Sequence, residues 1–434
     1  MTNKSLLQRS MQAVWHPCTQ MKQHELFPLI PISRGDGVWL TDADGKRYLD
    51  AVSSWWVNLF GHNNPRIKDA IKQQLDTLEH VMLAGFTHEP AVTLSEKLGK
   101  LTGLGHAFYA SDGASATEIA LKMSFHYWRN KGQSKKTKFI SLQNGYHGET
   151  LGALGVTDVP IFKDTYASLL VQSVQLPSPD WRLADAGESA EEYAIRCADA
   201  LEAYVAEYAD VLAAFIIEPL VQCAAGMGMY HSVYLKRARK ICSKYKVHLI
   251  ADEIAVGFGR TGTMFACESA SIKPDFMCLS KGITGGYLPL SAVLTTDKIY
   301  AAFYDDKIAK GFLHSHSYTG NPLACSAALA TLAIFEADDI LAKNKQKSVQ
   351  INDKMQALTH LPTKHLRNHG MIFAFDVKTK NTSFAKTCYA AALQQGLLLR
   401  PIGNTVYWMP PYVINETEIE FMVNASLAAV KKSL

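Results

Sequence analysis

The sequence has 434 residues, of which 48% are hydrophobic and 10% aromatic. This length and composition predict two or three folded domains with sizeable cores, and they exclude both a peptide-sized binding module and a largely disordered protein. The formal net charge is only +4 and is not gathered in one stretch, so we expect no nucleic-acid-binding function.

The cysteines and the apolar runs indicate the cellular compartment. The eight cysteines include no Cys-x-x-Cys pair, which favours reduced thiols over a zinc site or a disulfide framework. Residues 1–30 contain no apolar targeting core, and the longest clean apolar run, residues 211–217, is far too short to span a membrane. We therefore expect a soluble, cytoplasmic protein.

The first predicted element is a β-hairpin within residues 37–50, where Asp44-Gly45 favours a primed turn between two short strands. From about residue 105 onward, short apolar runs alternate with helical stretches, a pattern typical of βαβ units around a mostly parallel sheet. The candidate strands are residues 107–110, 139–142, 213–217, 247–251, 276–279 and 291–295.

Two stripes of apolar residues at helical spacing predict helices between these strands. One stripe, residues 116–127, starts directly after the turn at Asp112-Gly113-Ala114. The other, residues 194–208, contains Cys197, which we therefore interpret as a core residue. Residues 341–434 lose the βαβ rhythm and predict a smaller α+β domain, with strand-like pieces at 371–377 and 406–409.

Three candidate functional features lie at the ends of predicted strands and helices. Lys281 and Asp252 each follow an apolar strand, and ligands of doubly wound sheets bind beyond the carboxyl ends of strands. Gly113 and Ala114 open a helix whose N–H groups can hold a phosphate. A lysine amine for an aldehyde, a carboxylate for a ring nitrogen and a phosphate cradle suit pyridoxal 5′-phosphate.

Two other motifs suggest different chemistry. Residues 257–262 form a Gly-x-Gly-x-x-Gly sequence, but the dinucleotide interpretation requires a helix directly afterwards, and residues 263–269 show no helical stripe. His314 and His316 suggest a metal ligand pair. No third ligand stands at a suitable spacing, so we expect no metal.

Seven segments, six of them common to the class, resemble the class III aminotransferases of fold type I. They are residues 112–118, 144–148, 217–219, 251–254, 257–262, 280–282 and 319–322. The resemblance implies an α/β fold with a mostly parallel central sheet in a large domain, and a smaller α+β domain built from both termini. We expect residues 1–60 to join the small domain and the active-site wall, residues 61–335 to bind the cofactor, and residues 336–434 to complete the small domain.

The resemblance assigns roles around pyridoxal phosphate. Lys281 bonds covalently to the cofactor, Asp252 pairs with the ring nitrogen, and Tyr146 covers a ring face; these three are the expected catalytic residues. The other expected cofactor-binding residues are Asp112, Gly113, Ala114, Glu218 and Ile254, with His316 and Ser317 reaching in from a second subunit. The class therefore implies at least a homodimer with shared active sites.

Four further segments, residues 15–17, 53–56, 400–401 and 407–412, resemble a biotin-pathway subgroup of the class. Its members transfer the amino group of adenosylmethionine to 8-amino-7-oxononanoate. The expected substrate-binding residues are Cys18, Trp55, Trp56, Tyr146, Glu149, Arg260, Lys281, Ser315, Arg400 and Tyr407.

Three positions depart from the subgroup pattern. Cys18 stands in place of a tyrosine, Ser317 in place of a threonine, and Glu149 in place of an aspartate, which lengthens the arm toward Arg260. Because Cys18 replaces that tyrosine, the sequence does not exclude a variant of the enzyme that takes lysine as its amino donor. Aminotransferases of ω-amino acids, ornithine or 4-aminobutyrate share every cofactor residue. A silent cofactor-binding scaffold would not need Lys281 and its partners together.

Overall fold

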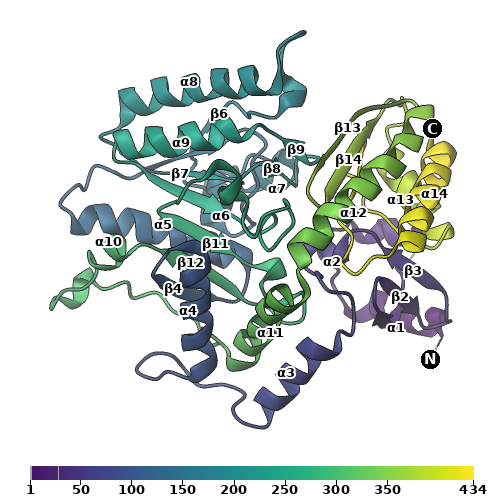
Figure 1. Cartoon of the computed structure of the whole chain (residues 1–434), viewed down its shortest axis with the longest axis horizontal. Coiled ribbons are helices and arrows are strands. Elements are labelled where there is room, and N and C mark those ends of the chain that lie inside the picture. Colours follow the sequence, from purple (N-terminus) through teal and green to yellow (C-terminus); the bar gives the residue numbers. More distant parts are fainter. Residues whose placement is uncertain (1, 28) are drawn as a thin grey trace. The chain divides into compact units, whose positions relative to one another are not determined.

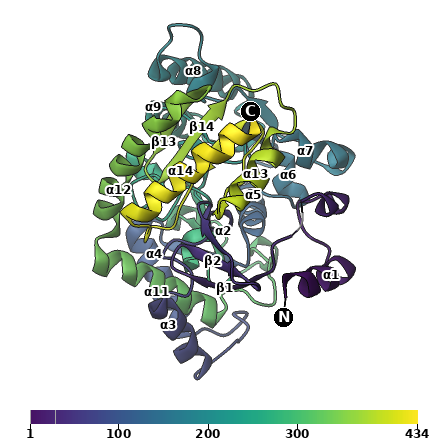
Figure 2. The ribbon, with the colours of Figure 1, turned by 90° about the vertical axis from the view of Figure 1, so that its right-hand side faces the viewer.

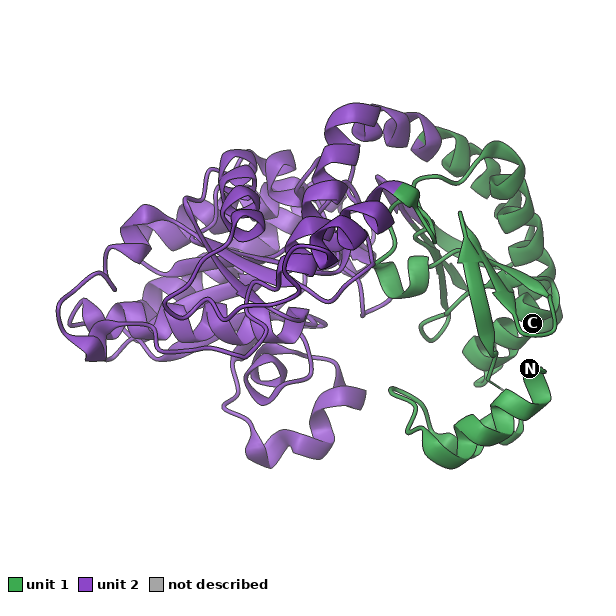
Figure 3. Ribbon diagram, turned by 90° about the horizontal axis from the view of Figure 1, so that it is seen from below, with its two compact units in different colours: residues 1–65, 349–366, 373–434 green, residues 66–348, 367–372 purple. Residues whose placement is uncertain are grey.

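The structure is a computed structural model that describes all residues except 1 and 28 (Figure 1). The chain divides into two compact units, coloured separately in Figure 3. Unit 1 comprises residues 1–65, 349–366 and 373–434, and unit 2 comprises residues 66–348 and 367–372. Both ends of the chain therefore belong to the smaller unit, as expected for the predicted fold class.

Unit 2 is built on a seven-stranded sheet with the order β4-β12-β11-β10-β7-β5-β6. The five strands from β11 to β6 run parallel, whereas β12 is antiparallel to both of its neighbours. The strands are β4 (His106–Ala110), β5 (Lys138–Leu142), β6 (Val174–Leu176), β7 (Leu212–Ile217), β10 (His248–Asp252), β11 (Phe276–Leu279) and β12 (Ser291–Thr295). The mostly parallel sheet and all six predicted strands are confirmed, and β6 was missed.

Both helices predicted from the apolar stripes are present in unit 2, as α5 and α8. Residues Ala116, Ile119, Ala120, Met123 and Tyr127 of α5 are all buried, and Cys197 of α8 is buried as expected of a core residue. The α-helices of this unit are α3 (Pro65–Leu75), α4 (Glu89–Thr102), α5 (Gly113–Asn130), α6 (Leu151–Val156), α7 (Pro160–Lys163), α8 (Ala190–Tyr208), α9 (Ser232–Lys244), α10 (Asp297–Tyr300) and α11 (Pro322–Asp338). Helix α12 (Ile340–Met355) begins in unit 2 and ends in unit 1.

Unit 1 joins the two ends of the chain through a four-stranded sheet of order β1-β2-β3-β15, in which β15 pairs parallel to β3. A second sheet has the order β13-β14-β16, and Figure 2 shows α14 beside α13. The elements are α1 (Asn3–Ala13), β1 (Ile32–Asp36), β2 (Trp39–Asp42), β3 (Arg47–Asp50), α2 (Ser53–Trp56), β13 (Thr363–His369), β14 (Ile372–Val377), α13 (Phe384–Gln394), β15 (Leu397–Leu398), β16 (Thr405–Trp408) and α14 (Glu416–Ser433).

The predicted hairpin of β2 and β3 is confirmed, but its predicted turn type is wrong. A primed turn of type I′ would place both Asp44 and Gly45 at positive φ, and of these two only Gly45 has one, at 93°. The Asp42 carboxylate accepts hydrogen bonds from the N–H groups of Asp44 (3.1 Å) and Lys46 (2.9 Å). These bonds stabilise a wider loop that ends in a left-handed glycine.

No helix in the described part of the chain has both the length and the apolar character needed to cross a membrane.

Candidate active site

Lys281 and Asp252 lie at the carboxyl ends of two neighbouring strands, as predicted. Strands β10 and β11 are parallel, and Asp252 pairs in register with Cys278, three residues before Lys281. Lys281 has a φ of +44°, a strained conformation for a residue with a side chain. Burial lowers the pKa of the Lys281 amine, and the negative charge of Asp252 opposes this shift. The site thus favours a neutral lysine more than water does.

Asp252 is held by a buried histidine that sequence reasoning missed. Asp252 is only 4% exposed, and its Oδ2 lies 2.7 Å from Nδ1 of His147. Its Oδ1 accepts a hydrogen bond from the N–H of Ile254 at 3.1 Å. The main chain of His147 is fixed by Thr117 and Thr157. The only signal in the sequence was the position of His147 within the segment 144–148.

Glu218 is a second buried carboxyl near this pair. Its Oε2 accepts from the N–H of Tyr146, and its Oε1 accepts from the N–H of Cys223, both at 3.0 Å. Burial, opposed by His147 and aided by the charge of Asp252, raises the pKa of Glu218 to about 7. Glu218 therefore positions the Tyr146 main chain with a carboxyl group that titrates near neutral pH.

This raised pKa predicts a pH dependence of stability. The folded state holds the Glu218 proton more tightly than the unfolded state, so stability should fall as the pH rises from about 4.5 to about 7. We expect the melting temperature of Glu218→Gln to fall less than that of the wild type between pH 5 and pH 7.5. Glu191→Gln, at an exposed position, is the matched control. Equal falls in the wild type and Glu218→Gln would contradict the shift.

The start of helix α5 is open to an anion. Asp112 caps the helix by accepting from the N–H of Ser115 at 2.9 Å, and no acceptor in the described chain binds the N–H groups of Gly113 and Ala114. A Cβ on Gly113 would lie 3.0 Å from Cγ2 of Ile254. The small residues thus leave the two N–H groups accessible, next to the Ile254 side chain.

These observations fit pyridoxal phosphate. Two free N–H groups at the start of an 18-residue helix suit a phosphate, and a buried aspartate at a strand end suits a cationic ring nitrogen. A buried lysine with a lowered pKa suits an aldehyde.

The remaining predicted residues of unit 2 are placed as follows. The Tyr146 hydroxyl donates to Oε1 of Glu149 at 2.8 Å, and this is the only bond of Glu149 in the described chain. In this structure the Glu149 carboxylate therefore binds Tyr146 and makes no hydrogen bond to Arg260. Arg260 is buried, and its carbonyl accepts from the N–H of Met371.

The predicted residues of the 311–319 loop differ in environment. Ser315 and Ser317 are exposed, whereas Nε2 of His316 is buried without a hydrogen-bond partner in the described chain. His314 bonds to Lys122 at 2.8 Å. Among the residues that the structure describes, no group of three or more ligands stands ready for a metal ion.

In unit 1, the segment Ser53–Trp56 forms a left-handed turn. All four residues have a positive φ, between 48° and 74°, although none of them is a glycine. The turn places the Trp55 ring against Arg400, whose guanidinium carbon lies 4.5 Å from the ring centroid. Trp55 is 43% exposed. Trp55 and Arg400, which were predicted to bind substrate and lie far apart in the sequence, are therefore in contact.

Side-chain hydrogen bonds hold this turn. Oγ of Ser53 donates to the carbonyl of Met409 at 2.6 Å, and Oγ of Ser54 donates to Oδ2 of the buried Asp50 at 2.7 Å. Nε1 of Trp56 donates to the Tyr407 hydroxyl at 3.2 Å. The predicted residue Cys18 is exposed, with a φ of 54°.

The fold and the site define a pyridoxal-phosphate-dependent transferase. Residues 19–430 match the family described as Aminotransferase class-III. The chain belongs to this family of aminotransferase enzymes, whose cofactor is pyridoxal phosphate. The predicted family, fold type and cofactor are thereby confirmed.

Individual relatives support the same assignment. The chain is 48% identical over 426 residues to an adenosylmethionine-8-amino-7-oxononanoate aminotransferase from Helicobacter pylori, covering 96% of this chain and 95% of the relative. A solved structure of the enzyme of that name from Methanocaldococcus jannaschii has a TM-score of 0.93 and 36% identity, covering 99% of both chains. An omega transaminase from Pseudomonas jessenii in complex with PMP has a TM-score of 0.93 and 30% identity, covering 99% of this chain and 98% of that one.

Proposed function

We propose that this enzyme transfers the amino group of adenosylmethionine to 8-amino-7-oxononanoate, giving 7,8-diaminononanoate in biotin biosynthesis. The observation that carries this proposal is the 48% identity, across nearly the whole chain, to a relative that bears the name of this activity. The pair of exposed Trp55 and half-buried Arg400 supports it, because a long apolar acid needs an aromatic wall and a cation for its carboxylate.

Pyridoxal phosphate, when bound, supplies an electron sink for negative charge at the carbon that carries the amino group. We propose that the N–H groups of Gly113 and Ala114 hold its phosphate, that Asp252 keeps its ring nitrogen protonated, and that Ile254 and Tyr146 enclose its ring. Lys281 would move the proton: its Nζ, whose neutral form burial favours, would accept a proton from the donor carbon and deliver it to the carbon that was the aldehyde carbon of the cofactor. His147 keeps Asp252 oriented throughout.

We propose that Arg400 binds the carboxylates of both substrates in turn, because its planar guanidinium grips a carboxylate with two charge-assisted hydrogen bonds. Contact with Trp55 holds the guanidinium in place. Trp55 also offers an exposed ring for the sulfonium cation of adenosylmethionine. Trp56 and Tyr407 are only 5% and 1% exposed, so in this proposal they support the turn. The other proposed substrate-binding residues are Cys18, Glu149, Arg260 and Ser315.

A substitution at Trp55 tests its role. We expect Trp55→Leu to raise the KM for adenosylmethionine about 2- to 30-fold, the equivalent of roughly 0.5–2 kcal/mol for one cation–π contact. Trp55→Phe keeps an aromatic face and should retain most of the affinity. Steady-state kinetics with the keto acid held at saturation measures both variants. An unchanged KM in Trp55→Leu would contradict the contact.

A panel of amino donors separates this function from its alternatives. The purified holoenzyme is assayed with adenosylmethionine, lysine, ornithine and 4-aminobutyrate, each with 8-amino-7-oxononanoate and with pyruvate as acceptor. We expect activity with adenosylmethionine and the 8-amino-7-keto acid. Activity with lysine instead would identify the lysine-dependent variant, and activity with pyruvate alone would overturn the proposal.

We also propose a cytoplasmic homodimer in which His316 and Ser317 serve the cofactor site of the partner subunit. In support, the loop that carries them leaves Leu313 and Tyr318 exposed, and large apolar side chains gathered on a surface are typical of interfaces. All eight cysteines are free, which suits a reducing compartment. Light scattering of the holoenzyme measures the dimer mass.

A further inference from the structure

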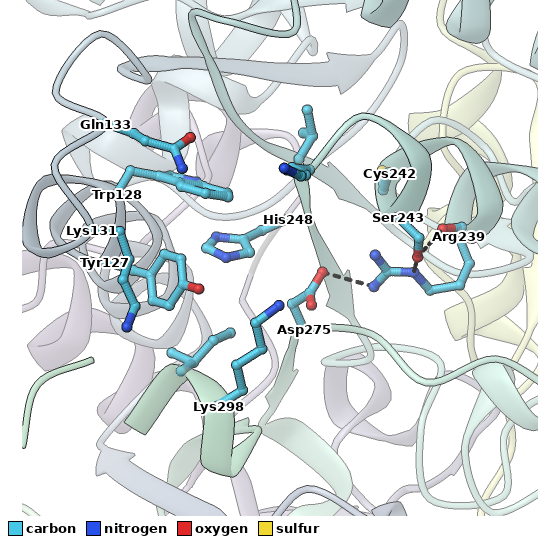
Figure 4. A pocket seen from close by; sticks show the side chains of 13 residues that line it. Tyr127, Trp128, Lys131, Gln133, Arg239, Cys242, Ser243, His248, Asp275 and Lys298 are labelled. Carbon is cyan, nitrogen blue, oxygen red and sulfur yellow. Dashed lines mark hydrogen bonds and ion pairs between the residues drawn. The ribbon is translucent and has the colours of Figure 1, made fainter. Parts of the chain in front are cut away.

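A cavity lies at the amino end of β10, whereas Asp252 lies at the carboxyl end of that strand. Figure 4 shows the residues that line this cavity. His248, which lines it, is the first residue of β10, and Asp252 is the last. The length of that strand separates the two residues by about 13 Å. The cavity has a volume of about 450 Å³, which is in the range of small-molecule sites. The proposed function makes no use of it.

Positive charge gathers around this cavity. Lys131, Lys246 and Lys298 line it, and none of the three forms an ion pair in the described part of the chain. Arg239 also lines it but is bound to Asp275 at 2.7 Å. The lysines therefore leave three positive charges uncompensated. Because nearby like charges repel each other, an anion between them would be stabilised.

Two buried polar side chains face the same cavity without a partner. His248 is 6% exposed and Tyr127 is 5% exposed. Neither Nε2 of His248 nor the Tyr127 hydroxyl has a hydrogen-bond partner among the described residues. Figure 4 shows the Tyr127 hydroxyl and the Lys298 amine directed toward the space beside the His248 ring. Both atoms therefore meet the open space of the cavity, where a ligand can bind to them.

The hydrogen bonds around His248 engage its Nδ1. Oγ of Ser124 lies 2.8 Å from Nδ1 of His248 and 3.4 Å from the carbonyl of Ala213, which also accepts from Nε1 of Trp128 at 2.9 Å. Burial lowers the pKa of His248 to about 4, so the ring is neutral at pH 7. The Nε2 atom of a neutral ring donates or accepts a hydrogen bond according to the tautomer, so it can bind either a terminal oxygen or a protonated oxygen of a ligand.

We propose that this cavity binds a small metabolite through a phosphate group, with Lys131, Lys246 and Lys298 around the phosphate and with the Tyr127 hydroxyl and His248 Nε2 as hydrogen-bonding groups. A phosphate carries up to two negative charges and three terminal oxygens, which match this set of donors better than a monocarboxylate does. The Trp128 ring already stacks on His248, with centroids 4.6 Å apart, so recognition of an aromatic base by that face is not part of the site.

Calorimetry of the cofactor-saturated holoenzyme with pyrophosphate as the probe tests this site. We expect saturable binding at one site per chain, and a loss of affinity of about tenfold or more in the double variant Lys131→Gln/Lys298→Gln. The matched control, Lys236→Gln/Lys240→Gln, removes two exposed lysines of α9 that do not line the cavity and should bind as the wild type does.

A milder variant covers the case in which the lysine double variant does not fold. Tyr127→Phe removes only the hydroxyl and should weaken pyrophosphate binding while leaving the melting temperature of the free enzyme close to that of the wild type. Absence of saturable binding to the wild type, equal losses in both lysine double variants, or tighter binding of citrate than of pyrophosphate would each overturn the proposal. Unchanged binding in Tyr127→Phe would remove its hydroxyl from the site.

Discussion

Lys281→Ala should lose turnover by about a thousandfold or more while still binding pyridoxal phosphate, because it removes the amine that moves the proton. The proposed phosphate site at Gly113 and Ala114 and the carboxylate of Asp252 remain in the variant. Steady-state rates with adenosylmethionine and 8-amino-7-oxononanoate measure the loss. The absorbance of the dialysed protein measures the retained cofactor.

Lys386→Ala is the matched control, since Lys386 is exposed on α13 and is assigned no part in the site. It should keep the wild-type rate. Borohydride reduction and peptide mapping give an independent readout, in which the reduced tag should lie on Lys281. Wild-type turnover in Lys281→Ala, or a tag on another residue, would refute the assignment.

The second large effect is expected for Asp252→Asn, which keeps the shape of the side chain and removes its charge. An uncharged amide cannot favour a cationic ring nitrogen, so turnover should fall about 100- to 1,000-fold. Because Asp252 also pairs with His147 at 2.7 Å, the loss of charge should weaken that contact as well. The rate is measured at saturating cofactor and substrates.

Asp69→Asn serves as the control because Asp69 is exposed on α3 and, among the described residues, its side chain makes only a long ion pair with Lys72, at 3.8 Å. A weak exposed pair contributes little to stability. A rate in Asp252→Asn close to that of Asp69→Asn would show that the charge of Asp252 is not required.

The sheet of unit 2 could be predicted from the sequence because its strands are short, continuous apolar runs buried on both faces. Strand β6 escaped prediction because it has only three residues, the first of them exposed. The turn at Gly45 was misjudged because the side chain of Asp42 decides it, and dipeptide preferences do not include that contact.

Within the site, Lys281 and Asp252 were predictable because strand ends converge in a parallel sheet. The contact between His147 and Asp252 was not, because 105 positions separate them in the chain. The left-handed turn at Ser53–Trp56 could not be predicted from the sequence either, because glycine is the usual signal for a positive φ and this segment contains none. Its stability comes from hydrogen bonds to distant residues.

If Trp55 binds substrate as proposed, that turn couples the stability of the fold to substrate binding. Each of its four side chains makes the backbone less favourable by about 1–2 kcal/mol relative to a right-handed conformation, a penalty that glycine largely escapes. A glycine at Trp55 would therefore relax the main chain and at the same time remove the ring that lies against Arg400. Because the same substitution changes backbone strain and the proposed binding surface together, variants of the segment need to be screened for turnover as well as for melting temperature.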